Sequence, residues 1–393
     1  MLNTNGSAVT LNIGNQVYAW DNDVGNGRWD IGTTANWTST DNVFHDGDTV
    51  TFGDIGAGAV TVMANVSPGP VTFNNTLGSD YTFAGNSGSE TLACGGELRV
   101  LSGGDVTISN GIGGVAGIMH SGSGVLTLGG SNTFTGGITV KPAATLKAGN
   151  NQAFGATTQS QVLTVESGGT LDTGGYDFDE PYGAGSIVVS GAGVDGKGAI
   201  VNYTRDNTQT FDDELLLAGD TTFGGTKRWE VRGAGVETSV DEITITKVGT
   251  GRIALVSDNR SASVAEWIVN EGIIQIENNG SLAHGEVTVN SPAELSSWGN
   301  RTVQNHIRLN GGRIFVWNDK TVTCAWRMSV DGDSTLAPNW AAKAIVVAGS
   351  LSGTNQISVG NGLVRLSGDT SGFTGAISMT EAGGILGMDG TAN

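Results

Sequence analysis

Ligand-binding chemistry is first suggested near the start of the chain, by Trp20, Trp29 and Trp37 with Asp21 and Asp23 beside the first of them. Indole rings next to carboxylates can stack on sugar rings and bind their hydroxyl groups, and alternating acidic and amide oxygens can bind Ca²⁺. The loop lacks the distal glutamate that completes an EF-hand. Large apolar rings can instead cover an open strand edge, which is the interpretation we favour. We therefore expect a Trp-rich cap and no metal, with Asp21 and Asp23 as the residues that a calcium ion would contact.

A second aromatic group lies later in the chain and comprises Trp298, Trp317, Trp326 and Trp340, with Phe315 among them. Rings stacked on one outward face would bind a polysaccharide, whereas rings that point inward would stack from strand to strand as a core ladder. We favour the core ladder. The four tryptophans are also the candidates for stacking on a glycan.

Acidic residues cluster at 177–180 and 212–214, namely Asp177, Asp179, Glu180, Asp212, Asp213 and Glu214. A glycoside hydrolase needs two carboxylates at a set separation across one bond, and a polysaccharide lyase needs a base beside a cation. Neighbouring residues on a strand point to opposite faces, so neither cluster forms such a pair. We expect solvated turns and assign no catalytic residue.

Other catalytic and cofactor motifs are absent from the sequence. His45, His120, His284 and His306 are scattered without the spacing of metal ligands. No serine stands in a G-x-S-x-G turn, and no glycine run has the form of a phosphate-binding loop. The sequence therefore predicts no cofactor and favours a binding or structural role over an enzyme.

The high glycine and low proline content indicates which fold classes suit the chain. Glycine supplies 64 of 393 residues and proline only 6, a glycine share of about 16% against a usual ~7%. Such a chain turns often yet keeps nearly every backbone N–H for sheet hydrogen bonds. Cys94 and Cys324 are expected to be buried thiols, because a bridge over that separation is improbable in a repetitive fold.

The net charge and the hydropathy of the chain exclude some classes of partner and bear on its location. Nineteen basic and 38 acidic residues give a net charge of −19, which argues against nucleic acid and anionic membranes as partners. No run of 18 apolar residues could span a membrane. Residues 1–20 lack the basic and apolar regions of a signal peptide. We interpret the chain as a mature or truncated piece of an exported protein.

Short strands recur about every ten residues, as at Val125–Leu128, Ile138–Val140 and Ala144–Leu146. Most alternate apolar and polar residues, and Gly, Asn, Asp or Ser fills the gaps. A sandwich, a barrel and a β-solenoid all fit this pattern. The length of the helix-free chain and a recurring order of strand types favour the solenoid. At roughly 20–25 residues per turn, or coil, and ~4.8 Å per coil, it would form a rod on the order of 60–70 Å long.

One phrase in the sequence is repeated. The best copy is Gly124–Leu146, and weaker copies are Gly251–Ile274 and Gly362–Leu386. The first two are followed by related phrases that begin at Asn150 and Asn278. Repeated strand–turn units of this kind indicate a solenoid.

The first copy reads G-x-L-T-L-x-G-x-N-T-F-T-G-G-x-T-V and resembles the autotransporter-associated β-strand repeat of large exported bacterial surface proteins. The opening W-D…W…N-W…D-x-V-x-F pattern, from Trp20 to Phe52, also resembles the segment that often precedes such repeats. The resemblance implies a right-handed parallel β-helix carried to the cell surface. It implies a fold and an export route but no reaction.

The sequence thus predicts an all-β, single-stranded right-handed parallel β-helix, with residues 1–93 as Trp-rich cap and first coils and residues 94–393 as degenerate repeats. We expect a non-catalytic, exported surface or extracellular protein with a structural or adhesive role. Homo-oligomeric or fibre-like assembly is a further hypothesis, because open strand edges template pairing. The alternative is a carbohydrate-active β-helix, either a lyase or a hydrolase, or a module that binds an extracellular polysaccharide.

Overall fold

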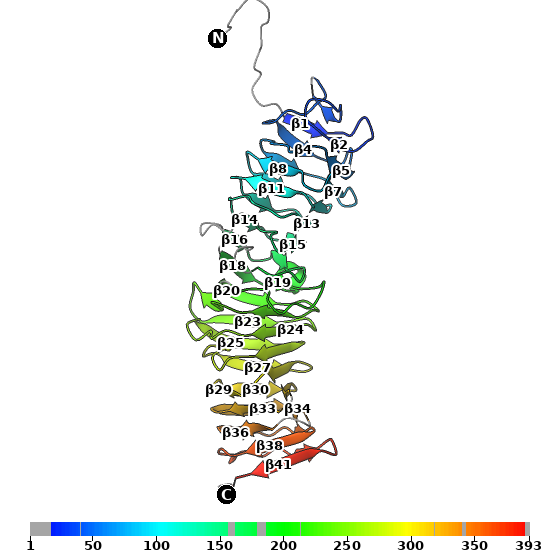
Figure 1. Cartoon of the computed structure of the whole chain (residues 1–393). Coiled ribbons are helices and arrows are strands. Elements are labelled where there is room, and N and C mark those ends of the chain that lie inside the picture. Colours follow the sequence, from blue (N-terminus) through cyan, green and yellow to red (C-terminus); the bar gives the residue numbers. More distant parts are fainter. Residues whose placement is uncertain are drawn as a thin grey trace, which may run out of the picture.

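The protein is a long rod whose regular secondary structure is almost entirely β-strand (Figure 1). The structure is a computed structural model, and it describes residues 17–39, 41–155, 162–178, 186–212, 214–317, 319–339 and 343–389. Strands make up 47% and helix about 1%, and the chain winds through about 15 turns of a parallel β-solenoid. The predicted all-β parallel β-helix is therefore confirmed. About 15 turns at ~4.8 Å each give a rod on the order of 70 Å long.

Strands of successive coils stack in register and form flat faces. One face includes β6 (Val71–Phe73), β9 (Leu98–Val100), β12 (Ile118–His120), β14 (Ile138–Val140), β16 (Val162–Val165) and β18 (Ser186–Gly191). The next includes β7 (Tyr81–Gly85), β10 (Val106–Ile108), β13 (Val125–Leu128), β15 (Thr145–Ala148), β17 (Thr170–Asp172) and β19 (Ile200–Val201). Ile118 pairs with Ile138, and Ile138 pairs with Leu163, so these two coils are 20 and 25 residues long.

Side-chain alternation explains why these segments form strands with one buried face. In β13, Leu126 and Leu128 are fully buried, whereas Val125 and Thr127 are only half-buried. Leu126 pairs with Val106 on one side and with Leu146 on the other. The inward side chains therefore stack from coil to coil into a continuous core, and the residues between them face outward.

The second half of the rod keeps the same construction with three separate ladders. A long strand, β20 (Leu215–Phe223), pairs with both β18 and β19 and so joins their two faces. After it, one ladder runs through β23 (Ile243–Lys247), β25 (Val264–Val269), β27 (Glu286–Asn290) and β30 (Ile307–Asn310). A second runs through β21 (Trp229–Val231), β24 (Arg252–Leu255), β26 (Ile273–Ile276), β28 (Glu294–Ser297) and β31 (Arg313–Val316). A third comprises β29 (Arg301–Val303), β32 (Thr321–Cys324), β35 (Ala344–Val347), β38 (Gly362–Leu366) and β41 (Gly384–Met388).

The three copies of the repeated phrase lie on different ladders. The first begins with β13 in the 26-stranded sheet, the second with β24 in the eight-stranded sheet and the third with β38 in the five-stranded sheet. The phrase thus encodes a strand, a turn and the next strand. It does not encode a fixed position around the coil.

The N-terminal end of the rod is filled by aromatic side chains. Trp20, Trp29 and Trp37 are almost completely buried, and the ring centroids of Trp20 and Trp37 are 5.1 Å apart. Trp37 belongs to β3 (Trp37–Thr38), which runs antiparallel to β1 (Val17–Trp20); among the described strands this is the one antiparallel strand pair. The predicted Trp-rich cluster is present, and a sugar-stacking role for these three rings is wrong because they are buried.

Both cysteines are buried and unpaired, as expected. Burial raises the pKa of the Cys94 and Cys324 thiols to about 12, because a thiolate would lose its hydration. In the described ranges we find no helix long and apolar enough to cross a membrane.

Candidate functional site

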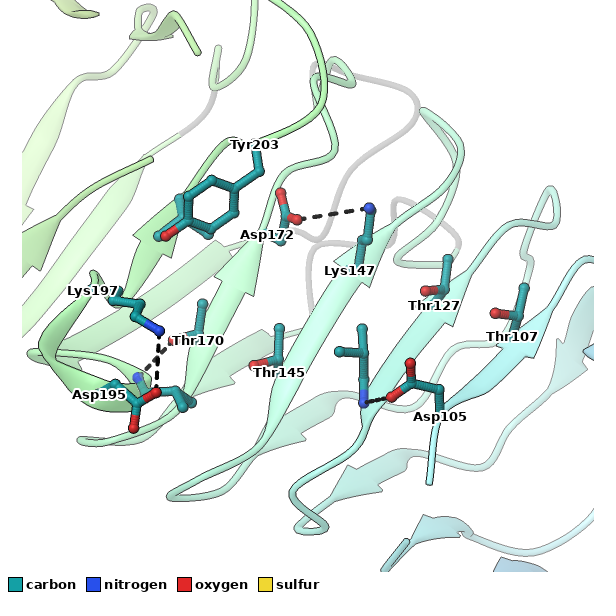
Figure 2. A pocket seen from close by; sticks show the side chains of 13 residues that line it. Asp105, Thr107, Thr127, Thr145, Lys147, Thr170, Asp172, Asp195, Lys197 and Tyr203 are labelled. Atoms are coloured by element: carbon teal, nitrogen blue, oxygen red, sulfur yellow. Dashed lines mark hydrogen bonds and ion pairs between the residues drawn. The ribbon is translucent and has the colours of Figure 1, made fainter. Parts of the chain in front are cut away.

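A groove of about 410 Å³ crosses β10, β13, β15 and β17 on their outer face (Figure 2). Its volume falls in the range of about 300–1,000 Å³ that is usual for ligand sites. The lining residues are Asp105, Thr107, Val125, Thr127, Thr145, Lys147, Thr170, Asp172, Val194, Asp195, Lys197, Val201 and Tyr203.

The floor of the groove consists of two rows of outward side chains set by the strand register. Thr107 pairs with Thr127, Thr127 with Lys147, and Lys147 with Asp172. A parallel row two residues earlier contains Val125, Thr145 and Thr170. Because β-branched residues suit an exposed pleated surface, the threonines support the strands and also present hydroxyl groups at strand spacing.

One end of the groove is closed by the segment between β18 and Tyr203, which includes the short 3₁₀ turn Val194–Gly196 (Figure 2). Thr170 holds this segment over the strands. Its Oγ1 donates to the Gly198 carbonyl at 2.9 Å and accepts from the Val194 N–H at 2.8 Å. The opposite end is open, since the row that contains Thr107 continues to the exposed Thr82 on β7.

Charged groups of both signs face the groove. The Nζ of Lys147 lies 3.9 Å from Oδ2 of Asp172, and Oδ1 of Asp172 accepts from the Gly174 N–H at 3.0 Å. Burial raises the pKa of the Asp172 carboxyl; the hydrogen bond from Gly174, the charge of Lys147 and a hydrogen bond from the Tyr203 backbone oppose this in part. Asp172 is thus a poorly hydrated acceptor beside an ammonium group.

The remaining charges of the groove have partners of their own. Oδ1 of Asp105 accepts from the Val125 N–H at 2.8 Å, and Lys197 pairs with Asp195 at 3.2 Å. The Tyr203 side chain is 43% exposed. Its pKa is raised by burial and by the charge of Asp172, while Lys197 lowers it. The hydroxyl is therefore protonated at neutral pH and can donate a hydrogen bond.

The geometry suits binding better than glycoside hydrolysis between the two carboxylates of the floor. Asp105 directly precedes β10 and Asp172 lies on β17, three ladder steps away, which separates them by at least about 14 Å at ~4.8 Å per step. Inverting glycosidases hold their carboxyl groups at most about 9.5 Å apart. These two carboxylates can therefore contact different parts of a ligand and cannot act together on one bond.

The three described tryptophans among those predicted to stack on a glycan do not line this groove. Trp298 and Trp326 are 54% and 62% exposed, so the core-ladder interpretation is wrong for both. Trp298 and Trp317 follow β28 and β31, and their ring centroids are 6.4 Å apart. The guanidinium of Arg252 covers the ring of Trp317 at 5.1 Å.

Trp326, a further member of the group, lies apart from this pair. Trp326 follows β32 and lines a separate hollow with His284 and Asn305. Trp340 lies outside the described residues. Stacking of a glycan on Trp298, Trp317, Trp326 or Trp340 stays a prediction; of the three described rings, those of Trp298 and Trp317 lie side by side.

The predicted calcium candidates form a tight turn beside the Trp-rich cluster. Oδ1 of Asp21 accepts from the Asp23 N–H at 3.1 Å. Within the described ranges no three His, Cys, Asp or Glu side chains come together as a metal site would require. Calcium binding by Asp21 and Asp23 stays a prediction.

The acidic clusters were expected to be solvated turns. Asp212 and Glu214 are exposed and Asp177 is half-buried, as that interpretation requires. Asp179, Glu180 and Asp213 lie outside the described residues.

The comparisons with known proteins give one informative match. No family model matches the chain, and no solved structure matches it. The chain is 31% identical over 186 residues to the adhesin BmaC autotransporter of Brucella suis biovar 1 (strain 1330). The chain is similar to an autotransporter adhesin. The match covers 45% of this chain, and the chain spans about 5% of the relative's length. Together with the parallel β-solenoid, it confirms the resemblance to autotransporter-associated β-helical proteins.

Proposed function

We propose that the protein acts as an exported, non-catalytic rod at the bacterial surface or outside the cell, with an adhesive or structural role. The observation that carries the proposal is the similarity of this parallel β-solenoid to an autotransporter adhesin. A rod of stacked coils holds long flat faces at a fixed distance from its ends, which suits display of binding surfaces.

Export is tested with an antiserum against the purified chain on source cells. We expect labelling of intact cells that protease treatment of those cells removes, with a cytoplasmic protein as the control for leakage. Labelling that appears only after permeabilisation contradicts the proposal.

Adhesion is tested with beads that carry the purified chain and with beads that carry an unrelated β-solenoid. We expect saturable attachment of the first kind to cultured epithelial cells, and competition by the free chain. Equal attachment of both kinds of bead, or release of reducing ends from polysaccharides by the free chain, contradicts a non-catalytic adhesive role.

The proposal includes the organisation and assembly expected from the sequence. Residues 1–93 would serve as cap and first coils, and residues 94–393 as the displayed shaft. Support for the cap comes from the packed rings of Trp29 and Phe44, whose centroids are 5.3 Å apart. Self-assembly rests only on the general tendency of strand edges to pair. Sedimentation at rising concentration tests it, and a constant monomer mass would remove self-assembly from the proposal.

A further inference from the structure

We propose that the groove across β10, β13, β15 and β17 binds the terminal part of a neutral, hexose-containing glycan. This inference rests on the proposed adhesive role and supplies its ligand. The ligand class follows from three properties of the lining: its shape, its paired charges and its one aromatic wall.

The shape suits the end of a chain of sugars. The segment that carries Val194, Lys197 and Tyr203 closes one end of the groove, and the floor continues past Thr107 toward Thr82 at the other. Outward hydroxyls repeat along the floor from strand to strand, as hydroxyls repeat along an oligosaccharide. A terminal sugar at the closed end would leave the following sugars over Thr145, Thr127 and Thr107 in turn (Figure 2).

The polar groups at the closed end suit a sugar that carries no charge. Asp172 can accept hydrogen bonds from two adjacent hydroxyls, and Lys147 can donate to a ring oxygen or hydroxyl while it still faces the carboxylate. Because the two charges already compensate each other at 3.9 Å, a neutral ligand leaves that balance intact. A ligand carboxylate would meet Asp105, Asp172 and Asp195 against two lysines, in a chain of net charge −19.

The aromatic wall gives the apolar face of a sugar ring a place to pack. Tyr203 is 43% exposed and lies beside Asp172 in Figure 2, where its ring borders the cavity. An extended peptide is less suitable, because the strands below already pair with one another in register and offer no free edge.

Binding is tested by calorimetry and ligand-observed NMR with neutral tetrasaccharides, namely cellotetraose, maltotetraose and lacto-N-neotetraose, and with the acidic sialyllactose and tetragalacturonate. We expect at least one neutral tetrasaccharide to bind, and Tyr203→Ala and Asp172→Asn each to weaken it at least tenfold. Thr127→Val should weaken it several-fold. Circular dichroism and the thermal transition of each variant check that the solenoid is intact.

The competing prediction, that the exposed tryptophans hold the glycan, is tested by Trp298→Ala, which removes an exposed ring next to a strand of a different ladder. This variant should bind as the unchanged chain does. Three results would overturn the inference: binding of the acidic sugars alone, no binding of any neutral tetrasaccharide, or loss in Trp298→Ala with full binding by Tyr203→Ala.

The bead assay separates this inference from the adhesive role. If Tyr203→Ala beads attach as well as unchanged beads, the groove is not the adhesive site, although the adhesive role stands. If the free chain binds a neutral tetrasaccharide through Tyr203 while beads do not attach to cells, the groove stands and the adhesive role fails.

Discussion

Asn132 and Asn259 make the same bridge across three coils in two copies of the repeated phrase. Oδ1 of Asn132 accepts from the Ile112 N–H at 2.8 Å, and its Nδ2 donates to the Ala153 carbonyl at 2.6 Å. Oδ1 of Asn259 accepts from the Val236 N–H at 2.9 Å, and its Nδ2 donates to the Ser281 carbonyl at 2.7 Å. Both stand eight positions after the glycine that opens their copy of the repeat. The asparagine of the repeated phrase thus replaces backbone hydrogen bonds at a corner.

Asn132→Ala and Asn259→Ala should each destabilise the solenoid by about 1–3 kcal/mol, because each leaves a buried N–H and a buried C=O without partners. Urea unfolding followed by circular dichroism measures the loss. The exposed Asn86 provides the control, and Asn86→Ala should stay within about 0.5 kcal/mol of the unchanged chain. Similar effects at all three positions would contradict the bridging role.

Much of the fold follows from short-range sequence pattern. Alternation within Val125–Leu128 is enough to predict a strand with Leu126 inside, because a one-residue slip would turn both leucines outward. The face that each copy of the repeat occupies could not be predicted. Coils vary in length, as the 28 residues between the paired Ile187 and Leu215 show, and any corner accepts the same strand–turn unit.

Trp29→Ala should destabilise the N-terminal end by about 3–5 kcal/mol, the usual cost of truncating a buried aromatic side chain. The ring of Trp29 lies 5.4 Å from that of Trp37 and 5.5 Å from that of Phe52, so the cavity would open in the centre of the Trp-rich cluster. A solenoid need not unfold in a single step, so the N-terminal end can have a urea transition of its own. Near-ultraviolet circular dichroism, which reports on packed aromatic rings, measures that first transition. Trp326→Ala, at a ring that is 62% exposed, should leave that transition unchanged.

His120 should make the solenoid less stable in mild acid. Its side chain is fully buried, and burial lowers its pKa below the ordinary 6.5, although hydrogen bonds to the Val100, Gly124 and Thr145 carbonyls oppose the shift. As the pH falls below 6.5, His120 binds a proton in the unfolded chain but not in the folded chain. The free energy of unfolding therefore decreases until the pH reaches the pKa of His120 in the folded chain. The slope cannot exceed about 1.4 kcal/mol per pH unit. In His120→Gln this slope should disappear between pH 7 and 5; an unchanged slope would assign it to other groups.

Lys247 should make the stability of the solenoid depend on pH in the alkaline range. Its ammonium group is buried and donates to the carbonyls of Val248 at 2.8 Å and Glu271 at 3.1 Å. Burial lowers its pKa from 10.5 to about 7, and the charge of Glu271 offsets this in part. Between those values the unfolded chain binds more protons, so stability rises with pH by up to about 1.4 kcal/mol per unit. Urea unfolding at pH 7.5 and 9 should show this rise in the unchanged chain and not in Lys247→Met.

The groove was not predicted from the sequence, and its construction explains why. Thr107, Thr127, Lys147 and Asp172 meet only when the lengths of three coils are known, and no spacing rule joins them. Tryptophans can be recognised in a sequence as candidates for stacking on a sugar, whereas the polar residues of a ligand-binding strand have the same pattern as those of any solvent-exposed strand. One signal was present: the glycine-rich stretch 191–198, with its single Asp and Lys, marks an outward loop where most coils have a short turn.

Gly193 is the residue on which the closed end of the groove depends. Its φ of 74° lies in the left-handed region, and a Cβ there would stand 1.9 Å from the Gly198 carbonyl oxygen. Gly193→Ala should therefore displace the loop that Thr170 holds, and weaken binding of the neutral tetrasaccharide at least tenfold while the coils on either side stay folded. Gly196 is the matched control, because its φ is also positive, at 71°, but nothing lies within 4 Å of an added Cβ. Gly196→Ala should therefore lose much less affinity. If both variants bind equally well, the loop does not shape the site, and the floor of threonines with Lys147 and Asp172 would have to hold the ligand without it.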